Sequence, residues 1–578
     1  MENSVQLTSG NVAPPHGTCS NLLLRRIRGL KPINFWQEAK LICKLAGPVF
    51  LTQLLISLIN IVSFAFCGHL GKIELDAVSL ATASITLSGT SIGIGLSTAC
   101  DTLISQTYGS KNLKRIGVIL QRGILILLIA CFPCWAILIN IEHILLAFKQ
   151  SPAVAKLTQL YVKTYIPALP AAILYDLELR YLQSQGIIMP QVFVGFITNI
   201  FNAVINYLFL YMLKLGVLGS AAANVASQYC QLLLLFGYIR WKKLHVQSWG
   251  GWSTDCLQEW GPFLRLAVPS MVMMCIEWWT YQIGTFLVGS INEVQLGAHA
   301  IINQTLLLTF MVPLGFSVAT AVVVGNALGA RDPQRAVNYV KVAMCCIGFF
   351  CFINAVILGS IKDVVGYVFV SDKEIVDIAA QIIPLGAVFH LFDAMAGVSS
   401  GVLRGAGKQK LGAIGNLIGY YLIGLPIGIA LMFAGKLGAL GFWSGATISV
   451  IVQLTFFQTV ICRINWKKTS NQAQLNAGMV RDVSASNSAS AGQTKNTSTE
   501  ADRESGAVLL MPTVLQSEQK TDKGQVTDEA SIVDTGVTTV GEILSIKQLI
   551  IRRGLAFLSG LLILATGLAI HLSLAKDL

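Results

Sequence analysis

The chain has 578 residues, of which 54% are hydrophobic and only 12% are charged, with a mean hydropathy of +0.65. An average soluble domain carries roughly 25% charged residues, so this composition excludes an ordinary soluble protein and indicates a membrane protein. We interpret the formal net charge of +12 as the basic excess of cytoplasmic loops, and therefore expect a lipid bilayer and no nucleic acid as a partner.

Apolar segments along the chain predict two sets of six transmembrane helices. The first set spans residues 46–67, 77–99, 116–139, 159–181, 189–211 and 215–239, and the second spans 262–284, 296–321, 335–358, 376–400, 411–433 and 437–461. A thirteenth helix is predicted near 554–575, after a polar Ser/Thr-rich segment that we interpret as a disordered cytoplasmic linker. The predicted domains are an N-terminal cytoplasmic segment 1–44, an N-lobe 45–245, a C-lobe 246–468, the linker 469–545 and a terminal helix within 546–578.

Basic residues fix the predicted orientation of these helices. Arg25, Arg26 and Arg28 precede the first helix, Lys467 and Lys468 follow the twelfth, and the alternate loops contain few basic residues. Because basic loops stay on the cytoplasmic side, the N-terminus is predicted to be cytoplasmic, and thirteen crossings place the C-terminus outside.

The two sets of helices are related by an internal repeat. The stretch LAGPVF (45–50) aligns with LAVPSM (266–271) at an offset of 221 residues, Gly95 pairs with Gly315, and LGVLG (215–219) pairs with LGALG (437–441). Parallel repeats of this kind are typical of transporters, whose substrate site lies between the two halves. The predicted fold is therefore an all-α polytopic membrane protein with two pseudo-symmetric six-helix bundles and a terminal thirteenth helix.

Two carboxylic acids lie well inside predicted spans of the C-lobe. Glu277 is part of CIEWWTY, and Asp393 is part of FHLFDAMAG, with His390 one helical turn before it. A carboxylate at the centre of a membrane helix costs at least about 2.5 kcal/mol, and no lysine or arginine is evident deep in the neighbouring spans. The structural alternative is a helix–helix hydrogen bond or salt bridge. A desolvated carboxyl group naturally holds either a proton or a cation, so we predict that Glu277, Asp393 and His390 couple transport to protons.

Aromatic residues beside Glu277 suggest the kind of substrate. Tyr281 is four residues from Glu277 on the same helical face, and Trp278 is its neighbour, so both are predicted to bind an organic cation through their rings. Trp279 is as well explained by contact with lipid or by packing.

Other polar groups and motifs in the spans have structural interpretations. Asp101 is expected to form a cap or an inter-helix contact, and Asp176, Glu178 and Arg180 are expected to pair with one another. GTSIG (89–93) matches a hydrolase motif but lies in the middle of a helix, and CFPC (131–134) has no second ligand pair. No nucleotide-binding or zinc-hydrolase motif is present, so we expect no enzyme, no cofactor and no metal site.

Several long stretches resemble the vertebrate multidrug and toxin extrusion (MATE) transporters. They include FCGHLGKIELDAVSLA, GLSTACDTLISQTYGS, IEWWTYQIG and SGVLRGAGKQKLGAIGNLIGYYLIGLPIGIALMF, and the similarity covers about residues 35–468. The resemblance implies two lobes that alternate in access and export organic cations such as drugs, toxins and metabolites in exchange for protons. It also implies a monomer of the plasma membrane. Glu277 matches the glutamate of the family's seventh helix, and Asp393 an acidic position where close relatives show Glu.

The chain departs from the close vertebrate members at positions that the resemblance assigns to the substrate site. Gln282 and Gln304 stand where those members carry glutamates, and Asn303 and Phe310 stand where tyrosines are expected. With Gln53 in the N-lobe, these residues join Glu277, Trp278 and Tyr281 as predicted substrate-binding residues. Because two fewer carboxyl groups reduce the counter-charge, we predict a divergent paralogue with a shifted substrate range, still driven through Glu277 and Asp393.

Other functions of the same chain stay open at this stage. A sodium-coupled exporter is one alternative, since the glutamine carbonyls could serve as oxygen ligands for Na⁺. A lipid-linked flippase is another, although the deep spans lack the basic clusters that would bind phosphates. A channel or a scaffold that has lost transport belongs to a different class of function.

Overall fold

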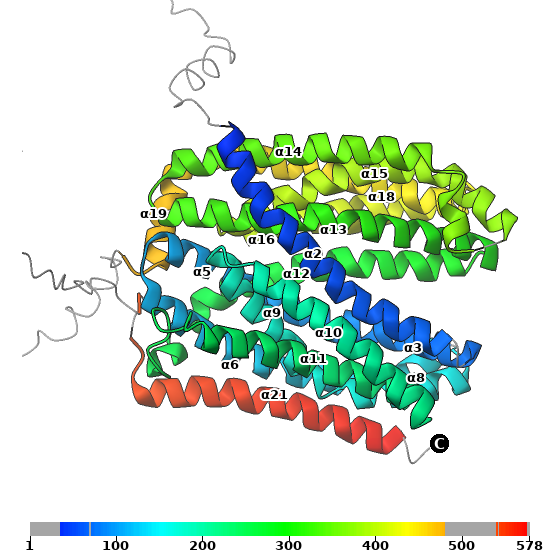
Figure 1. Cartoon of the computed structure of the whole chain (residues 1–578), viewed down its shortest axis with the longest axis horizontal. Coiled ribbons are helices and arrows are strands. Elements are labelled where there is room, and N and C mark those ends of the chain that lie inside the picture. The colour runs from blue at the N-terminus through cyan, green and yellow to red at the C-terminus, as the bar shows by residue number, and fades with distance from the viewer. Residues whose placement is uncertain are drawn as a thin grey trace, which may run out of the picture.

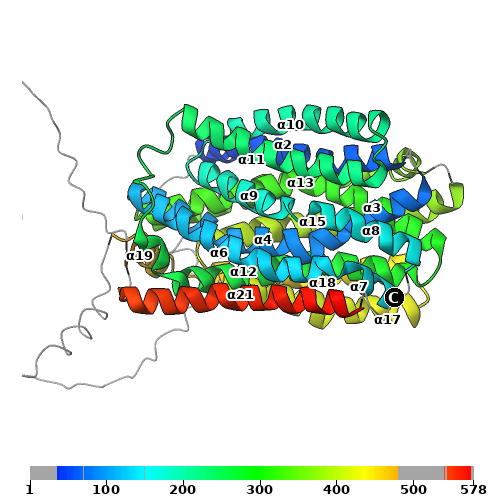
Figure 2. The same ribbon diagram turned by 90° about the horizontal axis from the view of Figure 1, so that it is seen from below.

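The computed structural model describes residues 35–68, 71–148, 150–370, 372–479, 539–540 and 543–574. Within these residues all the regular secondary structure is helical and no strand occurs, which confirms the predicted fold class. The long helices run roughly parallel to one axis of the molecule (Figures 1 and 2). Most of the predicted linker lies outside the described residues.

The N-lobe is formed by the helices α2 to α11. Their bounds are α2 (Phe35–Gly68), α3 (Lys72–Ile85), the π-helical turn η1 (Thr86–Thr90), α4 (Ser91–Ser97), α5 (Ala99–Gly109), α6 (Leu113–Ile139), α7 (Ile141–Ala147), α8 (Pro152–Tyr165), α9 (Ala168–Ser184), α10 (Met189–Tyr207), the π-helical turn η2 (Leu208–Met212) and α11 (Gly216–Trp241). The short segments α3, η1, α4 and α5 follow one another closely, so that residues 73–109 form a single long rod.

The C-lobe is formed by the helices α12 to α18. Their bounds are α12 (Trp260–Gly289), α13 (Glu293–Gly329), α14 (Pro333–Ser360), the 3₁₀ turn η4 (Val365–Val368), α15 (Lys373–Gly405), α16 (Gln409–Asn416), the π-helical stretch η5 (Leu417–Gly424), α17 (Leu425–Phe433) and α18 (Ala439–Arg463). The 3₁₀ turn η3 (Thr254–Leu257) lies in the connector between the lobes, and α19 (Trp466–Asn476) and α21 (Ile546–Leu574) follow the C-lobe.

Ten helical segments of the described residues are long and apolar enough to cross a membrane, judged by length and composition. The other three predicted spans are also helical. They correspond to α11, to α12 and to the pair α8 and α9, which is interrupted at Ile166 and Pro167. These helices run alongside the ten segments in the same bundle (Figure 1).

The first helix of each repeat crosses from one lobe to the other. The start of α2, with Ile42 and Val49, is buried in the core of the C-lobe, whereas its later part packs against α10 of the N-lobe. Conversely, the start of α12, with Phe263 and Ala267, is buried in the core of the N-lobe, and its later part lies in the C-lobe. Figure 1 shows α2 running diagonally across the other helices.

Paired prolines and glycines of the repeat lie at these two crossings. Pro48 and Pro269 lie inside α2 and α12, where a proline removes one backbone hydrogen bond and favours a kink. A Cβ atom on Gly315 would lie 2.6 Å from the carbonyl oxygen of Ala46 in α2, and one on Gly95 would lie 2.5 Å from the Cα atom of Met271 in α12. Only glycine therefore allows the helices to approach this closely.

Several predicted boundaries need correction. The helix α2 begins at Phe35, inside the predicted N-terminal segment 1–44, and α15 continues beyond residue 400 to Gly405. Residues 469–476 belong to α19 rather than to a disordered linker, because their side chains find hydrogen-bonding partners on both lobes. The terminal helix begins at Ile546, earlier than the predicted residue 554.

The terminal helix α21 packs along α6 of the N-lobe (Figures 1 and 2). A Cβ atom on Gly567 would lie 2.7 Å from the Cβ atom of Ala136, and the Asn140 side chain donates a 2.8 Å hydrogen bond to the Gly567 carbonyl. Small residues at the contact let the two helices pack closely. The thirteenth helix is thus an integral part of the bundle.

Candidate functional site

A cavity of about 300 Å³ lies between the two lobes. Helices α2, α3, α8, α9 and α11 of the N-lobe and α12, α13, α15 and α18 of the C-lobe contribute side chains to it. Its volume falls at the lower end of the range for small-molecule sites, which are mostly apolar with a few convergent polar groups. The cavity therefore occupies the position that the repeat predicts for a substrate site.

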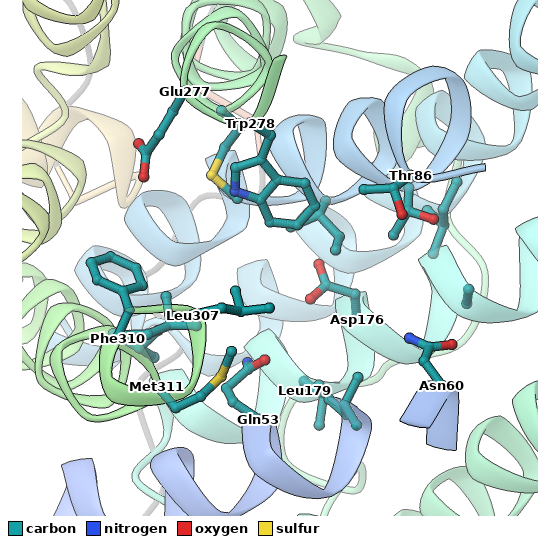
Figure 3. Close-up of a pocket in the computed structure, with 18 of the residues that line it drawn as sticks. Gln53, Asn60, Thr86, Asp176, Leu179, Glu277, Trp278, Leu307, Phe310 and Met311 are labelled. Carbon is teal, nitrogen blue, oxygen red and sulfur yellow. The ribbon is translucent and has the colours of Figure 1, made fainter. Parts of the chain in front are cut away.

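The C-lobe wall of the cavity contains both predicted acids. Glu277 on α12 and Asp393 on α15 line it. Trp278 and Phe310 line it as well and lie near Glu277 in Figure 3. The two carboxylates are close enough to interact electrostatically. Asn416, which itself bonds to the Met273 carbonyl at 2.9 Å, is also within hydrogen-bonding reach of Glu277.

The N-lobe wall supplies amides, hydroxyls and one acid. Gln53, Asn60, Thr86 and Asp176 point toward the cavity in Figure 3. Of these only Gln53 was predicted to bind substrate. The acidic residue Asp176 was expected to pair locally, so its place in the cavity wall was missed. The sequence signal that could have identified it is the spacing of Asp176 and Arg180 at i and i+4 inside an apolar helix.

Two buried arginines line this cavity. Arg180 Nη1 lies 2.7 Å from both carboxylate oxygens of Asp101, and its Nε lies 2.9 Å from Asp176 Oδ2. Arg404 of the C-lobe places its Nη1 3.5 Å from Asp101 Oδ2 of the N-lobe. We call these four residues, Asp101, Asp176, Arg180 and Arg404, the four-charge cluster. The expected inter-helix role of Asp101 and the expected pairing of Asp176 with Arg180 are confirmed. The expected pairing of Glu178 with them is wrong, because among the described residues its buried Oε2 atom has no hydrogen-bonding partner.

The expectation that no lysine or arginine lies deep in the spans is wrong. Arg404 lies beyond the predicted end of its helix at residue 400, but α15 extends to Gly405 and buries Arg404 to 6% exposure. Arg180 and Arg404 both line the cavity. The helix continues because its last turn packs against α13 at Gly401 and Gly405, where glycine permits contact with the Ser317 and Ala321 carbonyls.

The charges of the four-charge cluster cancel, which leaves the two C-lobe acids uncompensated. Two guanidinium groups face two carboxylates in the cluster. Among the ion pairs of the described residues, none within 4 Å includes Glu277 or Asp393. Since a buried uncompensated carboxylate is costly, these two groups favour a proton or a bound cation.

The remaining predicted site residues lie outside the lining of this cavity. Tyr281 packs against the rings of Tyr420 and Phe389, at centroid distances of 6.4 and 6.5 Å. His390 is buried and its Nε2 lies 2.9 Å from Asn354 Nδ2.

The residues Gln282, Asn303 and Gln304 are half-buried in α12 and α13. Trp279 is 40% exposed and donates a hydrogen bond to the Leu87 carbonyl.

The lobes are in contact at the end of the bundle that contains α19, which we call the α19 end. Thr102 of the N-lobe donates a 2.6 Å hydrogen bond to the Arg404 carbonyl, and Gln106 donates one of 3.0 Å to the Gly405 carbonyl. The helix α19 joins both lobes, because Asn476 bonds to Gln106 while Ser470 bonds to the Leu328 carbonyl. The cavity is therefore closed toward the α19 end.

Comparisons with known proteins identify the family. The family model MatE matches residues 48–208 and again residues 269–430. The chain belongs to the MATE family. The two matched stretches begin 221 residues apart, at 48 and 269, which confirms the offset of the internal repeat.

Relatives of this MATE chain cover nearly its whole length. It is 51% identical over 556 residues to the zebrafish (Danio rerio) multidrug and toxin extrusion protein 1, covering 96% of this chain and 93% of the relative. It is 50% identical over 556 residues to the human protein of that name, covering 96% and 97%. It is 48% identical over 569 residues to mouse (Mus musculus) multidrug and toxin extrusion protein 2, covering 97% and 96%.

Solved structures share the fold of this MATE chain. The crystal structure of the eukaryotic MATE transporter AtDTX14 superimposes with a TM-score of 0.74 at 29% identity, covering 77% of this chain and 99% of that one. A Vibrio cholerae MATE transporter, VcmN in the bent form, gives a TM-score of 0.66 at 16% identity, covering 76% and 99%. The chain is thus a multi-pass membrane transporter with the two-bundle fold of its family.

Proposed function

We propose that this transporter exports organic cations in exchange for protons, by alternating access of a cavity between its two lobes. The observation that carries the proposal is the pair of uncompensated carboxylates, Glu277 and Asp393, in a cavity that also contains Trp278 and Phe310. Carboxylates supply the counter-charge for a cation, and aromatic rings contribute roughly 0.5–2 kcal/mol more. The vertebrate relatives are named multidrug and toxin extrusion proteins, which supports efflux of drugs and toxins as the kind of transport.

The residues have separate roles in the proposed exchange. Glu277 and Asp393 hold either the substrate cation or protons, and the exclusion of one by the other couples the two movements. Trp278, Phe310 and Gln53 contact the substrate. His390, which lies one helical turn before Asp393 and bonds to Asn354, remains a proposed proton-coupling residue. Tyr281, Gln282, Asn303 and Gln304 remain proposed substrate contacts for a second arrangement of the lobes, since they lie beyond the lining of the present cavity.

The proposed setting is the plasma membrane, with a single chain as the working unit. The positive-inside pattern places the α19 end in the cytoplasm and the end of α21 outside. With that orientation, closure at the α19 end makes the present arrangement outward-facing. Protons from outside then displace the substrate, and the reverse exchange occurs when the lobes contact each other at the opposite end.

The energetics of the exchange are simple if one proton replaces one monovalent cation. No net charge then crosses the membrane, so the membrane potential contributes nothing. Each unit of pH difference supplies about 1.4 kcal/mol, which corresponds to a tenfold concentration ratio. Transport is therefore expected to depend on the pH gradient and to be indifferent to voltage.

Vesicles that contain the purified chain test this proposal. An imposed pH gradient should drive uptake of labelled tetraethylammonium, and Glu277→Gln should reduce that uptake at least tenfold, while replacing sodium at fixed pH should change nothing. The matched control is Glu142→Gln, because Glu142 is an acid of the short helix α7 outside the cavity. Normal uptake by Glu277→Gln would rule out the proposed coupling, and dependence on sodium would favour the sodium-coupled alternative.

A further inference from the structure

Building on the proposed function, we propose that Arg404 is a positioning residue that changes its carboxylate partner when the lobes rearrange. In the present arrangement it lies against Asp101 of the N-lobe, and in the other arrangement it compensates Glu277 and Asp393 of its own lobe. Its position would then set how many positive charges the two acids can hold.

The guanidinium of Arg404 already extends from the contact between the lobes toward the cavity. Its Nη1 lies 3.5 Å from Asp101 Oδ2, and its Nη2 donates a 2.9 Å hydrogen bond to Ser317 Oγ. Ser317 in turn donates to the Gly397 carbonyl at 2.6 Å. Gly397 is one helical turn from Asp393 on α15, a rise of about 6 Å. Ser317 thus links the Arg404 guanidinium to the turn of α15 that follows Asp393.

Two further observations indicate that the contact of Arg404 with Asp101 is exchangeable. Asp101 has a second and closer partner within its own lobe, because Arg180 Nη1 lies 2.7 Å from both of its oxygens. The Nε atom of Arg404 is buried and has no hydrogen-bonding partner among the described residues. Arg404 and Glu277 also line the same cavity and lie within electrostatic range of each other.

A count of charges shows what the exchange would do. While the lobes meet at the α19 end, the four-charge cluster is neutral and the pair Glu277 and Asp393 carries two negative charges. When α5 and α15 separate, Asp101 and Asp176 keep Arg180, so the N-lobe group carries one negative charge. The C-lobe group of Glu277, Asp393 and Arg404 then also carries one. The group that contains Glu277 and Asp393 thus needs one positive charge fewer to become neutral.

This change in the net charge around the two acids has the sign that a cation/proton exchanger requires. With Arg404 withdrawn, the two acids take up a proton from the side open in the present arrangement. When Arg404 approaches, its positive charge favours the ionised carboxylate, so the O–H bond of one acid breaks and the proton passes to water on the other side. Other titratable groups within electrostatic range of the acids are Tyr281, Tyr420 and, for Asp393, Cys351, which all belong to the C-lobe and move with them.

The test separates proton coupling from substrate binding. Reconstituted full-length chain is assayed for tetraethylammonium uptake driven by a pH gradient, and for exchange of labelled against unlabelled tetraethylammonium at equal pH. Arg404→Gln should lower the pH-driven uptake at least tenfold and change the equal-pH exchange less than about threefold. Arg404→Lys keeps the charge and should restore pH-driven uptake to within about threefold of the unmodified chain.

Two further variants complete the design. Asp101→Asn removes the N-lobe carboxylate partner of Arg404 before the lobes rearrange. It should therefore raise the KM for tetraethylammonium about tenfold, with a smaller effect on the maximal rate. The matched control is Arg335→Gln, because Arg335 is exposed in the first turn of α14, where it lies over the Tyr339 ring outside the cavity. It should leave every value unchanged. Size-exclusion profiles show which variants fold.

Several results would overturn the inference. An Arg404→Gln chain with normal pH-driven uptake would show that the charge is not needed. Equal loss in both assays, or equal loss in Arg404→Gln and Arg404→Lys, would show that the residue only maintains structure. If the unmodified chain showed no pH-driven uptake, the proposed function itself would fail and this inference with it.

Discussion

The crossing of α2 over α13 can be tested by adding one methyl group to Gly315. The Cβ atom of an alanine there would lie 2.6 Å from the Ala46 carbonyl oxygen and 3.2 Å from the Phe50 nitrogen. An ordinary contact needs about 3.4 Å, so the helices must separate by about 0.8 Å. Both neighbours are backbone atoms, so no side chain can rotate away. Overpacking of this kind typically costs about 1–3 kcal/mol.

The same substitution at Gly348 in α14 provides a matched control. No atom lies within 4 Å of the Cβ position there, and alanine favours a helix by about 0.5–1 kcal/mol over glycine. Thermal unfolding in detergent should therefore shift downward for Gly315→Ala and upward or not at all for Gly348→Ala. Because α2 must move with both lobes, Gly315→Ala should also slow tetraethylammonium exchange. If both variants were equally stable, the helices would not be held together by a close backbone contact.

Two other features lead to measurable predictions. Trp278 lines the cavity and Trp279 does not. Trp278→Ala should therefore raise the KM for tetraethylammonium about tenfold, because a cation–π contact contributes roughly 0.5–2 kcal/mol. Trp279→Ala should change the KM less than about twofold, and equal effects of the two substitutions would place the substrate elsewhere. Burial raises the pKa of Glu259, but the guanidiniums of Arg115 and Arg122 outweigh burial and hold that pKa below its ordinary value of 4.5. The stabilisation from this carboxylate is thus complete above pH 4.5 and is lost as pH falls through the lowered pKa. Unfolding measured over a range of pH should show this loss of stability at acid pH in the unmodified chain and not in Glu259→Gln. At neutral pH the Glu259→Gln chain should be about 3–5 kcal/mol less stable than the unmodified chain.

The sequence predicts the architecture well because the membrane restricts the choices. Every backbone polar group in the bilayer needs an internal partner, so apolar segments of this length must be helices. The repeat of LAGPVF and LAVPSM then implies two equivalent lobes, and the twofold match of the family model bears it out. The diagonal course of α2 was not predictable from hydropathy. It depends on Gly95 and Gly315, whose role appears only when two helices are placed against each other.

The candidate site was predicted in part, for a related reason. Glu277, Asp393, Trp278, Phe310 and Gln53 all line the cavity. These residues stand out in the sequence because they are polar or aromatic groups within apolar helices. Arg404 was missed because a helix end is the least certain feature of a pattern, and a charge near an end normally belongs to a loop. Its burial results from packing between α13 and α15, which the pattern of one helix cannot show.

The contacts between the lobes are of two physical kinds, and the difference suggests how the transporter can move without coming apart. At the crossings, backbone packs directly against glycine, and such contacts have no polar partner to exchange. At the α19 end, close contacts of Gly109 and Gly329 with the backbone of the facing lobe are joined by hydrogen bonds such as those from Thr102 and Gln106 to carbonyl groups. A hydrogen bond contributes only about 0.5–1.5 kcal/mol net, since water replaces the partner when it breaks. The hydrogen bonds of the α19 end can therefore be exchanged for bonds to water at a cost that binding of a proton or a cation can offset.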